Sequence, residues 1–509
     1  MAGVRLIVIY IFIILNILYT NYTSVPIEFL VPHNFVTRVG MTLYKPNLVL
    51  HISKEYGKAK FGGMGTLITA LANAQSIAAS TLKISVLIPF YSFLKTRYTD
   101  ISLECHVNVN ISYTTISVPI WRIKDGDVVL FLAGQGNKFP FNISYYASNE
   151  NEIYGDPEKQ IYLTNDWKDL FFVKTAIEFA KVLGKQYNLI INAHGSTNAL
   201  VGLIKYYMWV PFVYTVHDCT FEFDYSLEIQ DLRIFFKDLI NPRIWFLSQF
   251  KPSVFGLSHA NTITTVSTDT QRRLLDDAVN SFTFNIRHMI KKIANSLEKV
   301  VVIPNCLEVR YPIKPFEFFK ILHIRKSIRE YLVHISVMPK ESLRNEVWML
   351  FVGRISKEKG ADHFFGLIKR IAQHNELNDI KIFFIIMGQQ FHDIDIEKLK
   401  SQIELHYAHS LLILDKSIQD DYGSSIRAAC DLSIVGSVTE AFGLVALEAL
   451  YFGHVIISTM AGGKQLTKDL EITETNSSRD GLTGVSPFFS LYPIPRNQIV
   501  GSIHTKYLL

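Results

Sequence analysis

The sequence predicts an α/β protein built from two doubly wound parallel sheets. Beyond residue 45, short runs rich in β-branched residues alternate with longer amphipathic stretches, which is the pattern of parallel strands joined by helices. These runs form two series, and the segment 308–346, rich in aromatic and basic residues, separates them. A chain of 509 residues that is 49% hydrophobic also has the length and composition of about two to four folded domains.

Each series is a succession of expected strands. The first series comprises residues 48–53, 84–89, 128–133, 189–194, 212–217, 262–267 and 301–305. The second comprises residues 348–353, 381–388, 411–414, 432–437 and 454–459. We therefore expect an N-terminal domain over 45–310, a linker with at least one helix over 311–345, a C-terminal domain over 346–490 and a tail over 491–509.

Charge and cysteine content exclude several classes of function. The formal net charge of +5 is small for this length, and no basic stripe is interleaved with aromatic residues, so nucleic acid is not an expected partner. The cysteines at 105, 219, 306 and 430 lie far apart and form no C-x-x-C pair. They predict neither a zinc site nor a disulfide scaffold, and one long-range disulfide stays open.

The first 25 residues differ from the rest of the chain. Arg5 precedes an apolar run over residues 6–19, in which only Asn16 is polar. This run is shorter than the roughly 20 apolar residues that span a bilayer, and no small-residue cleavage site follows it. We therefore expect a signal peptide or a signal anchor over 1–25, and a location in the secretory pathway or on a membrane. N-x-[ST] sequons at Asn21, Asn110, Asn142 and Asn476 fit such a location.

A glycine turn follows the first expected strand. In KFGGMGT (60–66), Lys60 enters the turn, and Gly62, Gly63 and Gly65 precede a predicted helix over 66–80. Backbone amides at a helix N-terminus can face an anion at short range, and the lysine adds positive charge. Close packing of a helix on a strand also demands glycines, so the turn taken alone fits an anion site and tight packing equally well.

A pair of cations follows the first strand of the second series. That strand is expected to end at Gly353, and Arg354 and Lys359 lie on the loop into the next helix. A guanidinium offers a planar fork to phosphate oxygens, and an ammonium offers a flexible point charge, so the pair can hold a diphosphate. The alternative is a surface loop in which Glu358 forms salt bridges.

The stretch VGSVTEAFGLVALEALYFG (435–453) gives the most specific signal. Glu440 precedes a predicted helix, and Glu448 lies eight residues further on, about 12 Å along a helix axis. One carboxylate can accept hydrogen bonds from hexose hydroxyls and the other from a ribose, while the amides of Gly443 and Leu444 face the diphosphate between them.

The same helix has a structural alternative. In that interpretation Glu440 is only a charge at the helix N-terminus and Glu448 is exposed. Leu444, Leu447 and Leu450 are expected to form the core face in either interpretation. After the next strand, MAGGKQL (460–466) makes a second glycine turn, and the amides of Gly462 and Gly463 can cover a donor sugar or its phosphate.

Taken in order, these blocks resemble the motifs of the starch and glycogen synthases over roughly residues 45–485. The family's acidic residue followed by K-x-G-G-L-G-D is matched by Glu55 and KFGGMGT. Its motifs H-A-H-D-W-H, T-[IV]-H-N, T-V-S and L-N-G-I-D correspond to NAHGST (192–197), TVHD (215–218), TVS (265–267) and IPNCLE (303–308). Its G-R-x-x-x-x-K-G is intact at 353–360, its E-P-C-G-L becomes EAFGL (440–444), and its T-G-G becomes AGG (461–463).

The resemblance implies the GT-B fold, two Rossmann-like domains facing a central cleft, and a retaining glucosyltransferase. Its partners would be a nucleotide sugar, ADP-glucose or UDP-glucose, and a glucan or oligosaccharide acceptor, with no cofactor and no metal. Catalytic roles fall to His194, Arg354, Lys359 and Glu440. Substrate-binding roles fall to Lys60, Gly62, Gly63, Gly65, Asp166, His217, Asn305, Gly353, Gly443, Leu444, Glu448, Gly462 and Gly463.

Departures from the family pattern keep other functions open. Thr66 replaces the acidic residue that closes the glycine loop, residues 195–197 replace D-W-H, and only 25 residues follow Gly484, where the family has further helices. These features favour a catalytically degenerate GT-B protein that binds nucleotide or glucan, or a shortened chain. The complete pair of Glu440 and Glu448 instead favours retaining transfer of another sugar to a lipid or glycan. An export signal would also suit a cell-wall α-glucan synthase-like branch.

Overall fold

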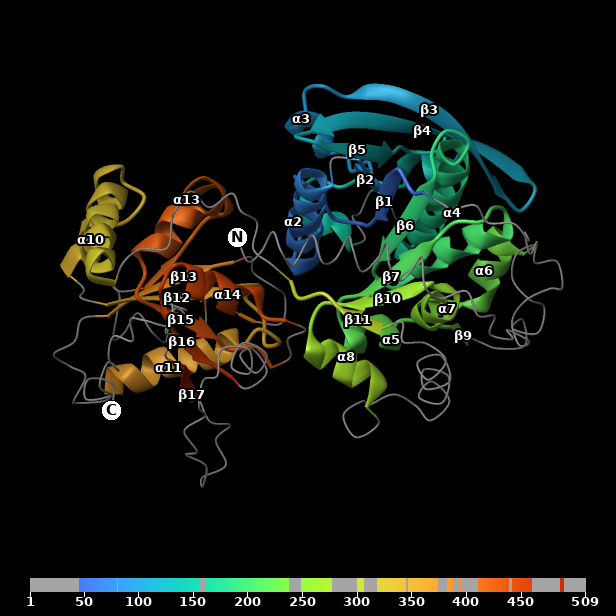
Figure 1. Cartoon of the computed structure of the whole chain (residues 1–509). Helices are drawn as coiled ribbons and strands as arrows, with labels where there is room; N and C mark the ends of the chain where they lie inside the picture. The colour runs from blue at the N-terminus through green and yellow to red at the C-terminus, as the bar shows by residue number, and fades with distance from the viewer. Residues whose placement is uncertain are drawn as a thin grey trace. The chain divides into compact units, whose positions relative to one another are not determined.

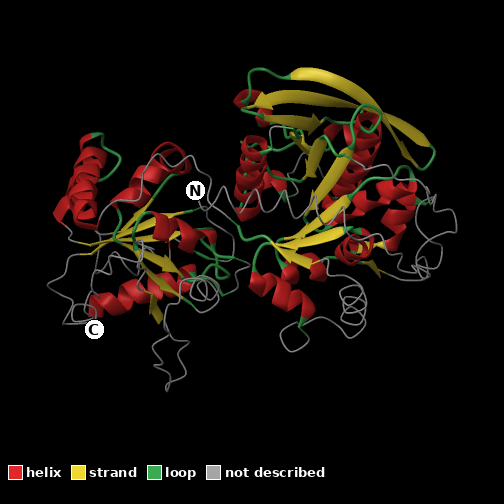
Figure 2. Ribbon diagram, in the orientation of Figure 1, coloured by secondary structure: helices red, strands yellow, loops and turns green. Residues whose placement is uncertain are grey.

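The computed structural model describes residues 45–79, 81–155, 162–237, 249–276, 300–305, 318–344, 347–373, 382–388, 394–395, 397, 411–438, 442–459 and 486–488. The chain divides into two compact units, residues 1–309 and 310–509, and each unit has its own sheet (Figures 1 and 2). Both sheets carry helices, so the expected α/β class is confirmed.

The first unit is built on a sheet of nine described strands in the order β11-β10-β7-β6-β1-β2-β5-β4-β3. Its strands are β1 (Leu48–Ile52), β2 (Lys83–Pro89), β3 (Ser102–Ile111), β4 (Thr114–Asp125), β5 (Val128–Ala133), β6 (Leu189–His194), β7 (Phe212–Val216), β10 (Thr262–Thr265) and β11 (Val300–Val302). All neighbours from β11 to β5 pair in parallel. Among the parallel strands, chain order runs outward from β1 through β2 to β5 on one side and from β6 to β11 on the other, so the order reverses between β1 and β6.

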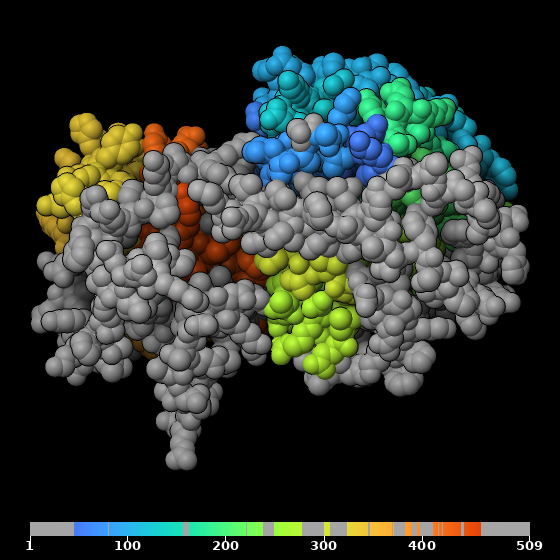
Figure 3. Space-filling model, in the orientation of Figure 1, coloured from blue at the N-terminus to red at the C-terminus, as the bar shows by residue number. Residues whose placement is uncertain are grey.

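The antiparallel hairpin of β3 and β4 was not expected from the sequence. It extends the parallel sheet beyond β5, and its residues alternate between buried and exposed along much of both strands. An edge hairpin with one solvated face needs only every second residue to be apolar, so it lacks the continuous apolar runs that identified the parallel strands. The blue residues of this hairpin lie on the outer surface of the first unit (Figure 3).

Helices and a small second sheet complete the first unit. They are α2 (Gly63–Ala78), α3 (Leu94–Arg97), α4 (Asn165–Leu183), α5 (Cys219–Asp224), α6 (Ile229–Phe236), α7 (Pro252–His259), α8 (Thr268–Leu275), the 3₁₀ segments η1 (Phe141–Ile143), η2 (Glu150–Ile153) and η4 (Thr197–Tyr206), and the two-stranded β8 (Leu227–Glu228) and β9 (Gln249–Phe250). One continuous hydrophobic core runs through the unit, from β1 to α8. The central strands β1 and β6 are buried along their whole length, as their apolar sequences require.

The second unit has a sheet in the order β14-β13-β12-β15-β16-β17. Its strands are β12 (Val347–Val352), β13 (Ile382–Met387), β14 (Leu411–Ile413), β15 (Leu432–Val435), β16 (Val455–Ser458) and β17 (Ser486–Phe488). β17 pairs antiparallel with β16, and the other pairs are parallel. Chain order reverses between β12 and β15, which is the arrangement of a Rossmann sheet.

Helices cover both faces of this second sheet. They are α10 (Phe318–His334), α11 (Ala361–Gln373), α13 (Lys416–Ala429) and α14 (Leu444–Tyr451), with the 3₁₀ segment η6 (Lys340–Arg344). Side chains alternate along β12, so Met349 and Phe351 pack with α11 on one face, while Trp348 and Leu350 pack with α10 and α13 on the other. One core therefore lies on each face of β12, as expected of a doubly wound sheet, and a smaller third cluster joins α14 to β15 and β16.

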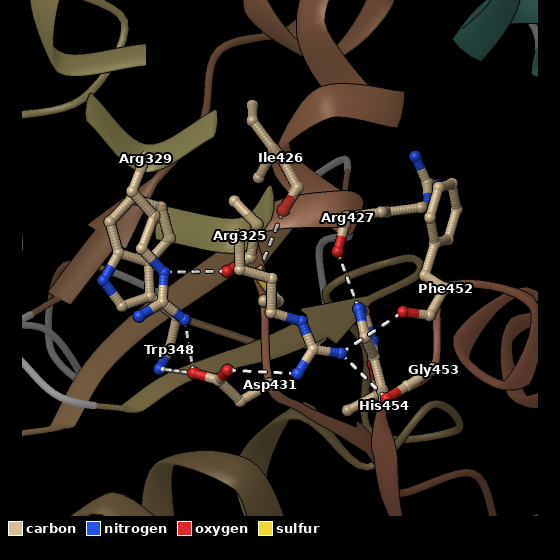
Figure 4. A network of polar contacts seen from close by, with 12 residues as sticks. Arg325, Arg329, Trp348, Ile426, Arg427, Asp431, Phe452, Gly453 and His454 are labelled. Atoms are coloured by element: carbon tan, nitrogen blue, oxygen red, sulfur yellow. Dashed lines mark hydrogen bonds and ion pairs between the residues drawn. The ribbon is translucent and has the colours of Figure 1, made fainter. Parts of the chain in front are cut away.

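The segment 311–345, which the sequence suggested as a linker, belongs to the second unit. Its helix α10 packs against α13, and its yellow residues form part of the outer surface of this unit in Figure 3. Two arginines of α10 reach the sheet (Figure 4): Arg325 and Arg329 both form ion pairs with Asp431, the residue that precedes β15. The guanidinium of Arg325 also donates to the carbonyl oxygens of Phe452, at 3.2 Å, and Gly453, at 2.8 Å.

Most predicted elements are present with small shifts of their ends. Every parallel strand expected from the sequence is found within two or three residues of its predicted bounds, and the helix expected over 66–80 begins three residues earlier, at Gly63. Within the described residues, no helix has the length and apolar character needed to cross a membrane. The apolar run 6–19 lies outside those residues. Cys105, Cys219 and Cys430 are free thiols.

Candidate functional site

The motif residues of the first unit lie where its strand order reverses. Ligands of open α/β sheets bind beyond the carboxyl ends of the strands at such a point. The segment that contains Glu55 and the glycines follows β1, and His194 ends the neighbouring strand β6. His217 follows β7, the next strand along. Residues far apart in the sequence are thus brought to one edge of the sheet.

A carboxylate of the chain itself occupies part of the glycine turn. Gly62 is the N-cap of α2, and Glu55 Oε2 accepts hydrogen bonds from the backbone amides of Phe61, at 2.7 Å, and Gly62, at 2.9 Å. Tyr154 donates its hydroxyl to Glu55 Oε1 at 2.6 Å. A Cβ at Gly65 would lie 2.7 Å from Glu55 Oε2, so this glycine makes room for the carboxylate. The turn does bind an anion, but the anion in this structure is internal.

The remaining residues of the turn stay at the surface. Gly62 and Gly63 are exposed, and Lys60 is half-buried. The neighbouring Lys54 forms an ion pair with Asp169 of α4, and its ammonium lies 5.1 Å from the centre of the Tyr154 ring. Positive charge therefore lines this edge of the sheet close to Glu55.

His194 is part of a chain of three imidazoles. It is fully buried, its Nε2 lies 3.0 Å from Nδ1 of His51, and its Nδ1 lies 3.0 Å from Nε2 of His217. The second nitrogen of His51, Nε2, lies 2.7 Å from Oε1 of Gln75 on α2. The chain Gln75–His51–His194–His217 thus connects a helix, two strands and the loop that follows β7.

Burial keeps these imidazoles neutral. Desolvation lowers the pKa of His51 to about 4, against a weaker opposing effect of the hydrogen bond with Gln75. Desolvation also lowers the pKa of His217 to about 4. The pKa of His194 lies well below its ordinary value, because of burial first and the two neighbouring histidines second. Near neutral pH each ring therefore carries a single N–H.

A buried glutamate fixes the loop that carries His217. Glu222 Oε1 accepts hydrogen bonds from the backbone amides of His217, at 2.6 Å, and Asp218, at 3.1 Å, and Tyr214 donates its hydroxyl to Oε2. Burial raises the pKa of the Glu222 carboxyl to about 7. This glutamate was not singled out from the sequence, because no local motif marks it.

Two weaker candidates of the first unit have separate surroundings. Asp166, in the first turn of α4, accepts a 2.6 Å hydrogen bond from the Tyr225 hydroxyl, and burial raises its pKa. Asn305 follows β11, and its backbone amide donates to the carbonyl of Val266 at 3.2 Å. The buried side-chain oxygen of Asn305 has no hydrogen-bond partner in the described part of the chain.

In the second unit the cation loop lies at the equivalent position. It begins at Gly353, directly after β12, and the residues after β15 approach it: the amide of Val438 donates to the Glu358 carbonyl at 2.9 Å. Gly360 has φ +71°, and a Cβ there would overlap the carbonyl oxygen of Gly436. Glycine is required at this position so that the two loops can pack backbone to backbone.

Both cations of the loop meet one carboxylate. Arg354 Nη2 lies 2.9 Å from Oε2 of Glu358, and Lys359 Nζ lies 3.6 Å from its Oε1. All three side chains are partly exposed, between 21% and 30%. The salt bridges to Glu358 are those that the sequence suggested for an ordinary surface loop. The loop nevertheless follows β12 where the strand order reverses, which is where Rossmann sheets bind ligands.

Helix α14 supplies the last described candidates. Its N-cap Gly443 has φ +88°, in the left-handed region, and Leu444 is its first residue. Glu448 forms an ion pair with Arg427 of α13, with Nε and Oε2 3.4 Å apart, and only 12% of its side chain is exposed. Ala446 and Ala449 are the buried residues of the helix, and the leucines expected at its core face are half-buried, with Leu450 packed against the core. Glu440, Gly462 and Gly463 lie outside the described residues.

Several residues of these arrangements escaped the sequence analysis. They are His51, Gln75, Glu222 and Arg427. His51, Gln75 and Arg427 are connected to motif residues through tertiary contacts, and His51 and His194 are 143 residues apart. Glu222 lies only five residues after His217, in a stretch that no motif marks. The signal available in the sequence was polarity in an apolar setting, since His51 interrupts the run LVLHI. Among the residues that the structure describes, no three or more histidine, cysteine, aspartate or glutamate side chains are arranged so that they could hold a metal ion.

Comparisons with known proteins agree with this geometry. Residues 48–292 match the model of the starch synthase catalytic domain, and residues 338–468 match that of the glycosyl transferases group 1. The glycogen synthase of Ralstonia nicotianae is 24% identical over 454 residues, which cover 87% of this chain and 78% of that protein. The glycogen synthase of Clostridium beijerinckii is 22% identical over 441 residues, covering 82% of this chain and 84% of that protein.

Two further similarities concern a shorter region and the fold. The gpi3 subunit of phosphatidylinositol N-acetylglucosaminyltransferase from Schizosaccharomyces pombe is 29% identical over 126 residues, 25% of this chain and 26% of that protein. The catalytic domain of starch synthase IV from Arabidopsis thaliana, solved with ADP and acarbose, superposes with a TM-score of 0.66 at 16% identity and covers 86% of each chain. This match shows the GT-B fold. The chain therefore belongs to the starch and glycogen synthase family of glycosyltransferases.

Proposed function

We propose that the protein is a retaining glucosyltransferase that moves glucose from ADP-glucose or UDP-glucose to an α-glucan acceptor. The observation that carries the proposal is the convergence of Arg354 and Lys359 on one carboxylate, where the strand order of the second sheet reverses. Such a point is the ligand site of Rossmann sheets.

The contacts of Glu358 indicate what the two cations can bind. They hold one carboxylate, with a single negative charge, at 2.9 Å and 3.6 Å. A nucleoside diphosphate brings more charge and more acceptor oxygens to the same two side chains, so it competes well with Glu358 for them. The same cations stabilise the charge that develops on the diphosphate as it leaves the sugar.

The role of Glu440 follows from the family resemblance, and the roles of Glu448, Gly443 and Leu444 follow from their spacing along the helix. Glu440 is assigned to the hexose hydroxyls and Glu448 to the ribose, and the amides of Gly443 and Leu444 face the diphosphate. Arg427 holds the carboxylate of Glu448 through their ion pair. ADP and acarbose are the molecules bound to the starch synthase IV that shares this fold, which supports a nucleotide and a glucan as the ligand classes.

A transfer assay tests the proposal directly. Labelled glucose is supplied as ADP-glucose or UDP-glucose, separately, to malto-oligosaccharides with the chain from residue 25 onward and with its Glu440→Ala variant. We expect elongation from one donor and none with the variant. Equal rates in the two proteins would remove the assigned site. Absence of product with nucleotide binding retained would favour the degenerate GT-B protein.

Nucleotide binding tests the role of the cation loop independently of turnover. In calorimetry with ADP and UDP, Lys359→Ala should weaken binding about tenfold, since one charged contact to phosphate is lost. Glu358→Gln should strengthen binding, because the competing carboxylate is removed. Lys357→Ala, an exposed lysine of the same loop, is the matched control and should leave the affinity unchanged. Equal weakening by both lysine variants would indicate general surface charge instead.

A second candidate is transfer of another sugar to a lipid or glycan. The 126-residue similarity to the gpi3 subunit and the pair of Glu440 and Glu448 favour it. Adding UDP-N-acetylglucosamine to the donor panel separates the candidates, because binding of that donor in place of the glucose donors would select the second.

The location predicted from residues 6–19 is a separate proposal. Asn110 and Asn142, the two sequon asparagines in the described residues, are both exposed and so accessible to a glycosyl group. Expression in a eukaryotic secretory system should give a chain that loses mass on N-glycosidase treatment. An Asn110→Gln, Asn142→Gln double variant should lose less, and an unmodified wild-type chain would count against passage through that compartment.

A further inference from the structure

The chain Gln75–His51–His194–His217 has a direction as well as a geometry. Its hydrogen-bond distances are 2.7 Å, 3.0 Å and 3.0 Å, from Gln75 to His217. Gln75, His51 and His194 are all at most 3% exposed, whereas His217 is half-buried. One end of the chain is therefore deep in the core, and the other is at the carboxyl edge of the sheet.

Hydrogen-bond chemistry fixes that direction. The atom of Gln75 that faces His51 is the carbonyl Oε1, which can only accept, so Nε2 of His51 carries its proton and donates. A neutral imidazole has one N–H, which leaves Nδ1 of His51 as the acceptor for Nε2–H of His194. By the same rule Nδ1 of His194 accepts from Nε2–H of His217. Each ring passes its orientation to the next.

Burial keeps each imidazole neutral, with a single N–H. A second proton on any ring would place two N–H groups in a chain that offers one acceptor per contact, and it would place a charge in the core. The lowered pKa values of all three histidines agree with neutral rings. Two side chains face the chain of imidazoles: Gln75 from α2, and Glu222 from α5, which accepts a hydrogen bond from the backbone amide of His217. Neither adds a second acceptor to a ring, so each ring keeps a single N–H.

The remaining nitrogen of His217 is where the chain ends. Its Nδ1 has no hydrogen-bond partner within the described residues, and the loop that carries it is held by Glu222. We infer that Gln75 and His51 are positioning residues that hold His217 in its Nε2-protonated tautomer, so that its Nδ1 accepts a hydrogen bond from a hydroxyl of the bound sugar.

The inference moves the sugar contact from His194 to His217. Both ring nitrogens of His194 are engaged with other imidazoles, so this side chain has no nitrogen left for a ligand. An unprotonated imidazole nitrogen accepts from O–H groups, which a hexose offers on several carbons and a phosphate at neutral pH does not. The ligand class rests on the proposed function, whereas the tautomer of His217 does not.

Nitrogen NMR of histidine-labelled protein reads the tautomer without any turnover. Correlations between ring carbon-bound protons and both ring nitrogens distinguish an N–H nitrogen from an unprotonated one, and a His217→Gln variant identifies the signals of His217. We expect an unprotonated Nδ1 in the wild type and a mixture of tautomers in Gln75→Met, which has a similar shape and no acceptor. Leu71→Met, a buried change on the same helix, is the control and should leave the tautomer as it is. A protonated Nδ1 in the wild type, or the same tautomer in Gln75→Met, would overturn the inference.

Kinetics then test the hydroxyl contact. Gln75→Met should lower kcat/KM for the nucleotide sugar about tenfold, while the affinity for the free nucleoside diphosphate stays unchanged, because the inferred contact of His217 is with the sugar. Parallel loss of both quantities would indicate a merely structural role and would overturn the inference. If the wild type transfers no sugar, the proposed function fails, and the NMR result still decides the tautomer.

Discussion

Each unit of this protein buries a polar network, and the two networks differ in charge and in position. In the first unit neutral imidazoles connect α2 to the carboxyl edge of the sheet. In the second unit two arginines surround Asp431 at the amino edge, beside the start of β12 and β15 (Figure 4). The backbone amide of Trp348 donates to the same carboxylate at 2.8 Å.

The difference shows two uses of buried polarity. The charged network has strong contacts but no alternative arrangement, and it lies away from the ligand edge, so its role is to hold α10 against the sheet. The imidazole network has weaker, neutral contacts whose direction is set at one end by the carbonyl oxygen of Gln75, and it ends at the ligand edge. Only the second kind can transmit the state of a buried residue to a bound molecule.

Acid should break the imidazole network first, and this is the largest effect that we expect. Unfolded histidines bind protons below about pH 6.5. Burial lowers the pKa of His51 and His217, which belong to the network, and of His259, which lies outside it at the end of α7, to about 4. The unfolded state therefore binds more protons in this window, and stability falls as the pH falls. Each group contributes on the order of 2 kcal/mol between pH 7 and 5.

Glu222 opposes this trend. Its pKa in the folded protein, about 7, lies above the ordinary 4.5, so the folded state binds the extra proton and is stabilised as the pH falls through the same range. The net loss should be about 4 kcal/mol for the first unit. Urea unfolding at pH 7, 6 and 5 measures it. His51→Leu should flatten the slope, and a first unit whose stability is constant or rises in acid would contradict the neutral network.

Removing the negative charge of the arginine network should lower the free energy of unfolding slightly less than acid does. Asp431→Asn keeps the shape of the side chain but removes the negative charge that the buried Arg325 and the half-buried Arg329 share. We expect a loss of about 3 kcal/mol in the free energy of unfolding of the second unit. Denaturant unfolding followed by the fluorescence of Trp348, which packs on Arg329, reports on this unit when the other tryptophans are replaced by phenylalanine in the wild type and the variants alike. Asp421→Asn, an exposed change on α13, is the control. Equal small effects in both variants would show that the pair with Asp431 is dispensable.

Removing the amide of Gln75 should lower the free energy of unfolding less than Asp431→Asn does. Gln75→Met leaves the Nε2–H of His51 without its acceptor, which should cost about 2 kcal/mol in the first unit. Thermal unfolding beside Leu71→Met measures it. A loss as large as that of Asp431→Asn would remove the distinction between the two networks.

The smallest expected effect is that of Arg329→Lys. Lysine keeps the charge near Asp431 but loses the 2.9 Å hydrogen bond from Nε to the Ala429 carbonyl and the stacking of the guanidinium on Trp348. We expect a loss of about 1 kcal/mol by denaturant unfolding. An unchanged stability would mean that charge alone carries this contact.

The sequence predicted the parallel strands well, because buried strands are continuous apolar runs that need no tertiary information. The edge hairpin of β3 and β4 was missed, since its alternation is weaker than those runs. The segment 311–345 looked like a linker because the residues that anchor α10 pair with Asp431, about 100 positions away.

The candidate site divides in the same way. Motifs with fixed local spacing, such as Arg354 and Lys359, were readable, and the structure brings both to Glu358. The seat of Glu55 on the glycine turn and the partners of His194 depend on which strands become neighbours. The spacing of residues along the chain does not predict which strands become neighbours.

The strand order affects the sequence in which the first unit folds during synthesis. β1 pairs with β2, which follows within about 35 residues, and also with β6, where Leu48 faces Leu189. One half of the sheet, from β1 to β3, can form from local contacts during synthesis, whereas the β1–β6 pairing requires the closure of a long loop. We therefore expect the histidine chain, which crosses that pairing, to be among the last features to form as the nascent polypeptide folds.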